Sequence, residues 1–197
     1  IEMNPLTVKG TYFPFVDALW PNIDRKREVI LILVCSWLIA LSAQVVIPLQ
    51  PVPVTGQTLG VLLTGALLGS KRGAITVLAY LFQGAVGLPV FAGGTSGLAK
   101  LVGPTGGYLM GFVAAAFVVG WLSEKGWDRR FITMIFSMVI GNGIIYASGL
   151  PWLAIFVGWG AVIKLGLAPF VVGDILKIAL AAIALPQIWR RVNMRHE

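Results

Sequence analysis

The charged residues of this sequence occur in clusters separated by long apolar stretches. They are absent from 29–70, 73–99, 101–123 and 131–163. A helix that crosses the hydrocarbon core of a bilayer needs about 20 predominantly apolar residues. Each of these stretches is long enough for at least one crossing. The pattern therefore predicts an all-α integral membrane protein.

The first charge-free stretch is too long for a single crossing, and Pro48, Pro51 and Pro53 interrupt it. Proline cannot continue a helix interior, so we interpret this stretch as two helices joined by a short extended turn. The sequence then predicts six transmembrane helices. They cover roughly 28–47, 55–70, 72–88, 104–122, 131–149 and 168–188.

This pattern divides the chain into three parts. Residues 1–27 form an N-terminal cytoplasmic or interfacial segment, 28–188 the membrane domain, and 189–197 a basic cytoplasmic tail. The first part contains aromatic residues but lacks the continuous apolar core of a secretory signal, which favours an interfacial position.

Basic residues predict the orientation, because cytoplasmic loops carry an excess of Lys and Arg. With a cytoplasmic N-terminus, only Lys100 and Lys164 fall in outer loops, and Lys177 falls inside the last helix. The cytoplasmic set is Lys9, Arg25, Lys26, Arg27, Lys71, Arg72, Lys125, Arg129, Arg130, Arg190, Arg191 and Arg195. We therefore expect a multi-pass protein of the cell (plasma or inner) membrane with both termini in the cytoplasm.

The composition narrows the possible functions. Hydrophobic residues make up 57% and charged residues 12%, with a mean hydropathy of +0.87. A soluble domain carries about 25% charged residues, so a soluble domain is excluded, as is a nucleic-acid binder despite the net charge of +7. The one cysteine, Cys35, excludes a disulfide framework. The one histidine, His196, lies beside the last residue, which argues against a histidine-based metal or catalytic site.

No Gly-x-x-x-x-Gly-Lys-Ser/Thr motif is present, so the sequence contains no phosphate-binding loop for ATP. We therefore expect binding or transport rather than bond-making chemistry, with no catalytic residue, no metal and no cofactor.

Asp174 and Lys177 interrupt the otherwise apolar stretch 165–189. At positions i and i+3 their side chains share one face of a helix. Each charge costs on the order of 2–3 kcal/mol inside a membrane helix. Two interpretations remain open: a mutually neutralising pair without a further role, or a polar anchor for a ligand that enters from outside.

The outer connection 87–104 is rich in glycine yet apolar, whereas a merely solvated loop would be polar. This composition is typical of a lid or plug over a cavity. The alternative is an interfacial loop without a gating role. Lys100, within this connection, is either a plain surface charge or a partner for an anionic ligand.

Small residues recur at four-residue spacing, which lets helix backbones approach closely in lipid. Examples are Gly103, Gly107, Gly111 and Ala115, and the pair Ser36 and Ala40. They indicate close packing within the chain or a face for a partner protein.

Five segments appear in an order that is specific in combination. They are Pro51-Val52-Pro53-Val54-Thr55-Gly56-Gln57-Thr58-Leu59, Leu67-Leu68-Gly69-Ser70-Lys71-Arg72-Gly73, Gly87-Leu88-Pro89-Val90-Phe91-Ala92-Gly93-Gly94, Gly103-Pro104-Thr105-Gly106-Gly107-Tyr108-Leu109 and Gly173-Asp174-Ile175-Leu176-Lys177. Over about residues 28–188 the chain resembles the BioY family, the substrate-binding S components of energy-coupling-factor (ECF) biotin transporters.

The resemblance implies a six-helix bundle that captures biotin at the extracellular side of the lipid bilayer. It also implies partners, namely a transmembrane coupling protein and two ATPase subunits, which alone would use ATP. Two alternatives remain: an S component for another vitamin, such as thiamine or riboflavin, and a solitary membrane vitamin transporter.

The resemblance also assigns roles to individual residues. Asp174 would accept the two ureido N–H groups of biotin, and Lys177 would donate to the ureido oxygen. The valerate carboxylate would lie near Lys100 and the glycine-rich loop. The remaining candidates are Gly93 and Gly94 in that loop, Phe91 and Tyr146 as walls for the fused ring, and Ser36 and Ala40 as the coupling face for a partner protein.

Overall fold

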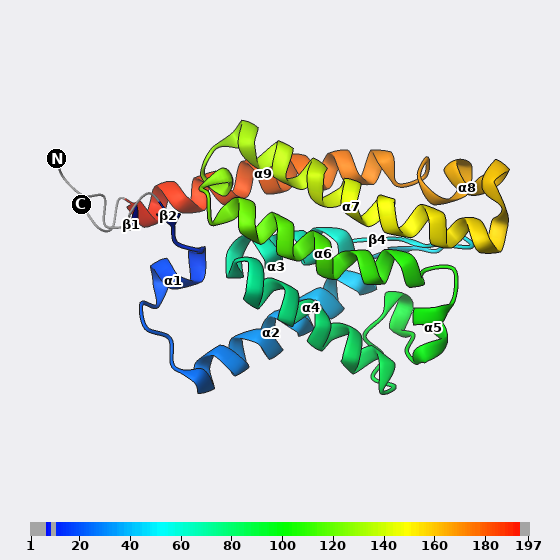
Figure 1. Ribbon diagram of the computed structural model, residues 1–197, viewed down its shortest axis with the longest axis horizontal. Coiled ribbons are helices and arrows are strands. Elements are labelled where there is room, and N and C mark those ends of the chain that lie inside the picture. The colour runs from blue at the N-terminus through cyan, green and yellow to red at the C-terminus, as the bar shows by residue number, and fades with distance from the viewer. Residues whose placement is uncertain (1–6, 9–10, 194–197) are drawn as a thin grey trace.

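The computed structural model describes residues 7–8 and 11–193, and these form an elongated bundle of helices (Figure 1). The long helices are α2 (Arg25–Gln44), α3 (Gln57–Leu68), α4 (Ser70–Ala85), α6 (Gly106–Ser123), α7 (Phe131–Val157) and α9 (Val171–Asn193). The short elements are β1 (Thr7–Val8), β2 (Thr11–Tyr12), α1 (Phe15–Leu19), β3 (Val46–Ile47), β4 (Val54–Thr55), η1 (Ala92–Gly94), α5 (Leu98–Val102), η2 (Trp127–Arg129) and α8 (Trp159–Gly166).

The all-α class is confirmed, and each of the six predicted ranges overlaps one long helix. Among the described residues, α2, α6, α7 and α9 are long and apolar enough to cross a membrane. The remaining long helices, α3 and α4, are shorter than these four. The predicted extended turn after α2 is also confirmed, because β3 and β4 pair antiparallel on either side of the proline-rich segment.

Two differences between the predicted and the observed boundaries bear on the site. The helix expected to end at 149 continues to Val157, with Pro151 inside it. Proline removes only one intrahelical hydrogen bond, and in membrane helices neighbouring groups compensate for it. The last helix begins at Val171, so Asp174 lies in its first turn rather than deeper in the span. A negative charge is favourable there because the helix N-terminus carries a partial positive charge.

Helix α6 lies at the centre of the bundle and packs against α3, α4 and α7. Its contacts with the neighbouring helices depend on small residues. A methyl group on Gly65 of α3 would lie 2.4 Å from the backbone oxygen of Ala116, and one on Gly111 would lie 2.0 Å from Oγ of Ser148. The small-residue stripe of α6 therefore serves packing within the chain.

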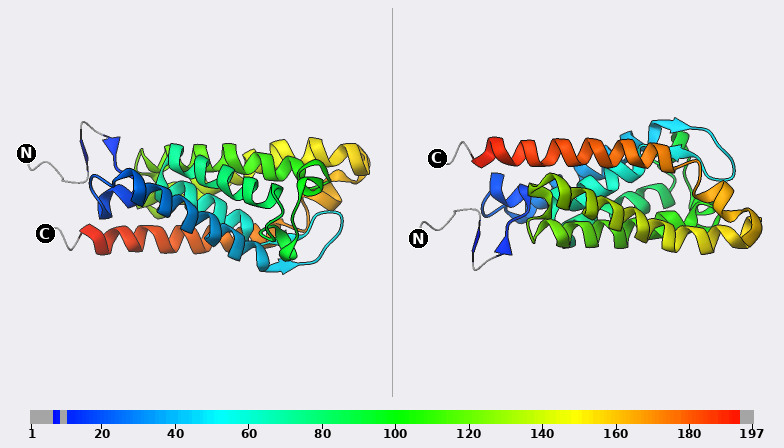
Figure 2. Two further views of the ribbon diagram at one scale, coloured as in Figure 1. Left: turned by 90° about the horizontal axis from the view of Figure 1, so that it is seen from below. Right: turned by 90° about the horizontal axis from the view of Figure 1, so that it is seen from above.

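The two ends of the bundle differ (Figure 2). One end holds α1 and the last turns of α9, and the other holds the β3–β4 connection, α5 and α8. At the first end, Phe15 meets Trp189 edge to face at 5.4 Å between ring centroids. Here α1 occupies part of the predicted N-terminal segment. Lys9, Arg195 and His196 lie outside the described residues.

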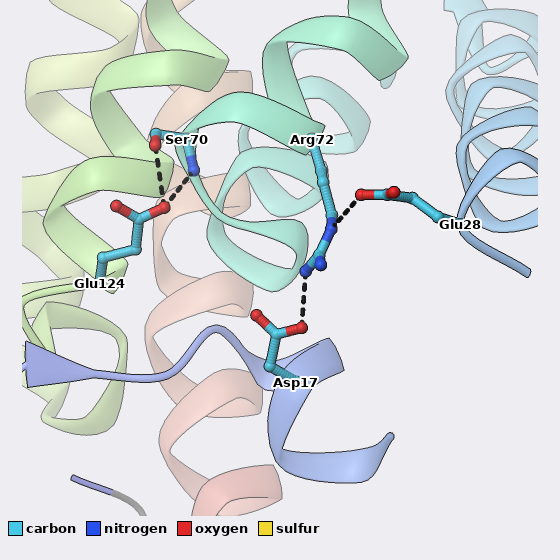
Figure 3. A network of polar contacts seen from close by, with 5 residues as sticks. All are labelled: Asp17, Glu28, Ser70, Arg72 and Glu124. Atoms are coloured by element: carbon cyan, nitrogen blue, oxygen red, sulfur yellow. Dashed lines mark hydrogen bonds and ion pairs between the residues drawn. The ribbon is translucent and has the colours of Figure 1, made fainter. Parts of the chain in front are cut away.

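A network of ion pairs fixes α1 in place (Figure 3). Arg72 at the start of α4 contacts Asp17 of α1 at 2.6 Å and Glu28 of α2 at 2.7 Å. Beside it, Glu124 accepts hydrogen bonds from the backbone N–H and the hydroxyl of Ser70, at 2.7 and 2.8 Å. One arginine thus joins three helices.

Candidate functional site

A pocket opens at the end of the bundle that holds α5 and α8. Its walls come from the β3–β4 connection, α3, the α4–α6 connection, α6, α7 and the segment before α9. The lining residues are Pro51, Val52, Pro53, Thr55, Gln57, Thr58, Phe91, Ala92, Thr95, Lys100, Thr105, Tyr108, Leu109, Phe112, Ile145, Tyr146 and Phe170. The cavity has a volume of about 100 Å³ and widens into an open mouth. Small-molecule sites usually span about 300–1,000 Å³, so a ligand of that size would occupy the mouth as well.

The charged pair of α9 lies directly behind this pocket. Lys177 Nζ is 3.2 Å from Asp174 Oδ1, and the Asp174 residue is only 6% exposed. Lys177 also donates to Thr58 Oγ1 at 2.8 Å, and the hydroxyl of Tyr146 donates to Asp174 Oδ2. Thr58 and Tyr146 both line the pocket. The two charges therefore neutralise each other and contact the pocket wall through two hydroxyl groups.

Aromatic rings form part of the wall beside these hydroxyls. Tyr108 stacks on Phe170 with ring centroids 6.2 Å apart, and Tyr146 meets each of them edge to face at 6.4 Å. Tyr108 is held in place because its hydroxyl donates to the backbone oxygen of Gly166 at 2.9 Å. Such a wall suits a flat or apolar ligand group.

The glycine-rich connection supplies another part of the wall. Phe91 is 2% exposed and meets Tyr80 edge to face at 5.6 Å. Gln57 donates to the Tyr80 hydroxyl at 2.5 Å, and that hydroxyl donates to the backbone oxygen of Val90 at 3.1 Å. These bonds tie the connection to α3 and α4, so this part of the expected lid is an ordered wall.

The predicted glycines lie within the same connection. Gly93 and Gly94 have φ angles of 65° and 71°, a conformation that a side chain disfavours. They flank the pocket without lining it, whereas Ala92 and Thr95 line it. Their role is to let the chain turn there.

Lys100 lies on α5 at the exposed mouth of the pocket. Among the described residues that line the pocket it carries the one positive charge. An exposed ammonium group at the mouth, above an apolar interior, suits a ligand with an anionic tail.

The structure thus brings together Phe91, Lys100 and Tyr146 in the pocket wall, with Asp174 and Lys177 behind it. Several polar or aromatic lining residues had no role in the sequence argument, among them Gln57, Thr58, Tyr108 and Phe170. Gln57, Thr58 and Tyr108 lie in two of the five segments that carry the family resemblance, and this was the available signal for them in the sequence.

Ser36 and Ala40 do not form an exposed face. Ser36 is fully buried and accepts a hydrogen bond from Gln83 of α4 at 2.9 Å, and Ala40 is 4% exposed. The small residues let α2 approach α4, so this pair lies inside the chain. Both residues thus lie in contacts within this chain, and the coupling face expected at these positions stays a prediction.

Comparison with known proteins agrees with this architecture. The model of the BioY family matches residues 17–194. A probable biotin transporter BioY of Pyrococcus horikoshii is 40% identical over 81% of this chain and 94% of its own length. The biotin transporter BioY of Thermotoga maritima is 44% identical over 80% of this chain and 92% of its own length.

A solved structure, the S-component for biotin from an ECF-type ABC transporter, is similar in fold. Its TM-score is 0.72 and its sequence identity 25%, and the match covers 85% of this chain and 95% of the solved one. Taken with the matched pocket-forming segments, these similarities establish that the chain belongs to the BioY family.

Proposed function

We propose that this chain is a membrane protein that binds biotin and takes part in its uptake as the S component of an ECF-type transporter. The observation that carries the proposal is the Asp174–Lys177 pair, bonded to two hydroxyls that line the pocket. The names of the curated relatives support biotin as the ligand. An S component captures a substrate and is not an enzyme.

The charged pair prepares the two hydroxyls for opposite roles. The hydroxyl of Tyr146 donates its hydrogen bond to Asp174, so its oxygen is left as an acceptor for a ureido N–H of biotin. Thr58 accepts from Lys177, so its own proton is free for the ureido oxygen. Asp174 and Lys177 thus set the direction of these hydrogen bonds. Rotation of either side chain toward the pocket would add a direct contact with biotin.

The remaining groups of biotin match the rest of the pocket. The rings of Tyr108, Tyr146 and Phe170 offer apolar surface for the fused ring system, and Phe91 lines the pocket from the α4–α6 connection. Lys100 at the mouth lies where the valerate carboxylate would reach water.

We further propose that all six long helices lie in the cell membrane with both termini in the cytoplasm. The positive-inside rule supports this orientation, since the start of α2, the α6–α7 connection and the end of α9 lie at the same end of the bundle and are rich in basic residues. The pocket then opens outward. A coupling protein and two ATPase subunits would supply the energy for accumulation.

Calorimetry on the purified chain tests the ligand assignment. Biotin should bind without ATP, and thiamine and riboflavin, as controls, should bind at least a hundredfold more weakly. Equal affinity for biotin and thiamine, or a folded sample without affinity for biotin, would refute the proposal. Vesicles that contain this chain alone should equilibrate biotin without accumulating it. Accumulation there would instead support a solitary transporter.

A further inference from the structure

A groove that shares no residue with the pocket lies between the end of α1 and the first half of α2. Its lining residues are Trp20, Ile23, Arg27, Ile30, Leu31 and Val34. The four residues from α2 follow the spacing i, i+3, i+4 and i+7, so they form one face of that helix. The face is apolar except for the guanidinium of Arg27 at its outer end.

Polar contacts hold the groove open. Arg72 binds Asp17 of α1 and Glu28 of α2, which fixes the separation of the two helices (Figure 3). Asp24 in the connecting loop caps α2, because its side chain accepts from the backbone N–H of Arg27 at 2.7 Å. The loop is therefore anchored at both of its ends, and the groove is a defined feature of the fold.

The charges at the groove select its occupant. Arg25, Lys26 and Arg27 are exposed at the start of α2, whereas the carboxylate of Glu28 is engaged by Arg72. Just beyond them begins the charge-free stretch 29–70. Trp20, 51% exposed, lies beside this boundary as tryptophan does at membrane surfaces. Basic residues at a membrane surface attract anionic lipid headgroups.

We propose that this groove binds one anionic phospholipid from the adjoining membrane leaflet. The phosphate lies at Arg27, with Arg25 and Lys26 close to it, and an acyl chain lies against Ile30, Leu31 and Val34. A lipid fits better than a protein helix because the apolar face continues directly from a basic cluster into the span. Of the four candidate spans, α2 is also the one least buried within the chain.

Native mass spectrometry of the purified chain tests the proposal, with dioleoyl-phosphatidylglycerol as the anionic probe and dioleoyl-phosphatidylcholine as the neutral one. The wild type should retain one phosphatidylglycerol in preference to phosphatidylcholine. Arg27→Gln should lower retention of phosphatidylglycerol about fivefold, the factor expected for one basic residue at a membrane surface. Lys125→Gln, which removes an exposed positive charge outside the groove, should leave it unchanged.

A steric pair of variants tests the apolar part. Val34→Trp fills the groove and should abolish preferential retention, whereas Leu33→Trp, on an exposed position of α2 that lies off this face, should not. Thermal unfolding of the same samples confirms that both variants are folded. Biotin affinity should stay at the wild-type value in Arg27→Gln, because Arg27 does not line the biotin pocket.

Equal retention by Arg27→Gln and Lys125→Gln, or by Val34→Trp and Leu33→Trp, would overturn the proposal. If these groove variants kept their lipid but failed to assemble with the coupling protein, the groove would be a protein interface instead, which also overturns it. Neither result would affect the calorimetric test of biotin binding, so the two proposals fail independently.

Discussion

Tyr146 of α7 donates a hydrogen bond to the carboxylate of Asp174 in the first turn of α9. This contact places a buried negative charge behind the wall of the pocket and turns the phenolic oxygen into an acceptor. Lys177, which also contacts Asp174, donates a hydrogen bond to the hydroxyl oxygen of Thr58, and this leaves the Thr58 hydroxyl free to donate. The site is therefore a set of four coupled side chains.

The first prediction concerns the charged pair. Asp174→Asn and Lys177→Ala should each weaken biotin binding about 30–150-fold, because truncation of one partner leaves the other buried and unpaired, which costs about 2–3 kcal/mol. The double variant should lose less than the sum of the two single losses if the pair acts as a unit. Calorimetry measures all three variants.

Lys164→Ala, on the exposed part of α8, is the matched control and should bind normally. If the pair serves only folding, the single variants will unfold at lower temperature while those that fold keep wild-type affinity. That outcome would remove the ligand role of Asp174 and Lys177.

The second prediction separates the two ends of the ligand. Lys100→Gln should weaken binding of biotin by about fivefold, but should leave binding of biotinamide unchanged, because the amide carries no charge for Lys100 to attract. Five-fold corresponds to an exposed ion pair of about 1 kcal/mol. Equal losses for the acid and the amide would place the carboxylate elsewhere.

The third prediction concerns helix packing. Gly65→Ala should destabilise the bundle by about 1–3 kcal/mol, since the added methyl meets the backbone of α6 and cannot be relieved by a side-chain rotation. Gly143→Ala, on an exposed position of α7 with no atom within 4 Å of the added methyl, should stabilise by at most about 1 kcal/mol. Thermal unfolding in detergent compares the two. A neutral Gly65→Ala would contradict the close approach of α3 and α6.

The fourth prediction concerns pH. In the α6–α7 connection, burial raises the pKa of Asp128 to about 6, although Trp189 donates to its carboxylate at 2.5 Å and Arg129 lies nearby. The folded chain then binds the proton more tightly than the unfolded chain does. The contribution of this group to the free energy of unfolding falls as the pH rises from about 4 through 6 and is lost above about 7.

The wild type should accordingly gain about 1 kcal/mol of stability at pH 5 relative to pH 7 from this group. Asp128→Asn should remove this part of the pH dependence while keeping an acceptor for Trp189. Asp24→Asn, at an exposed helix cap, should retain it. Identical pH profiles for the wild type and Asp128→Asn would show that Asp128 does not titrate in this range.

The fifth prediction concerns orientation, and the structure selects the positions. Ser123 is buried, so a cysteine there would be shielded on either side of the membrane. Lys125 and Ala99 are exposed at opposite ends of the bundle. In a Cys35→Ala background, an impermeant thiol reagent added to whole cells should label Ala99→Cys and spare Lys125→Cys. The reverse pattern would invert the topology.

The long helices could be predicted because their signals are local. Charge-free length and the prolines between Pro48 and Pro53 mark their positions directly in the sequence. The end of α7 could not be predicted, since Pro151 is tolerated only through contacts made by the folded bundle. Helix α1 was equally hidden, because it is held by Arg72 and Trp189, which are distant in sequence.

The same distinction between local sequence signals and long-range contacts applies to the site. The unusual residues Asp174, Lys177 and Lys100 stand out in an apolar chain, and they lie in or behind the pocket. Thr58 and Tyr108 have no unusual property until Lys177 and Phe170 lie beside them. A spacing of small residues predicts a close approach but not its partner, and at Ser36 the structure places Gln83 of α4.

The contact between Phe15 and Trp189 packs α1, the first described helix, against α9, the last one. During synthesis, the ring of Phe15 cannot make this contact until α9 has been made. Closing so long a loop comes late in folding, because its entropy cost is paid before the contact is gained. A docked α1 thus indicates that α9 is in place. Removal of the last turns of α9 would first release α1, although the two helices are distant in sequence.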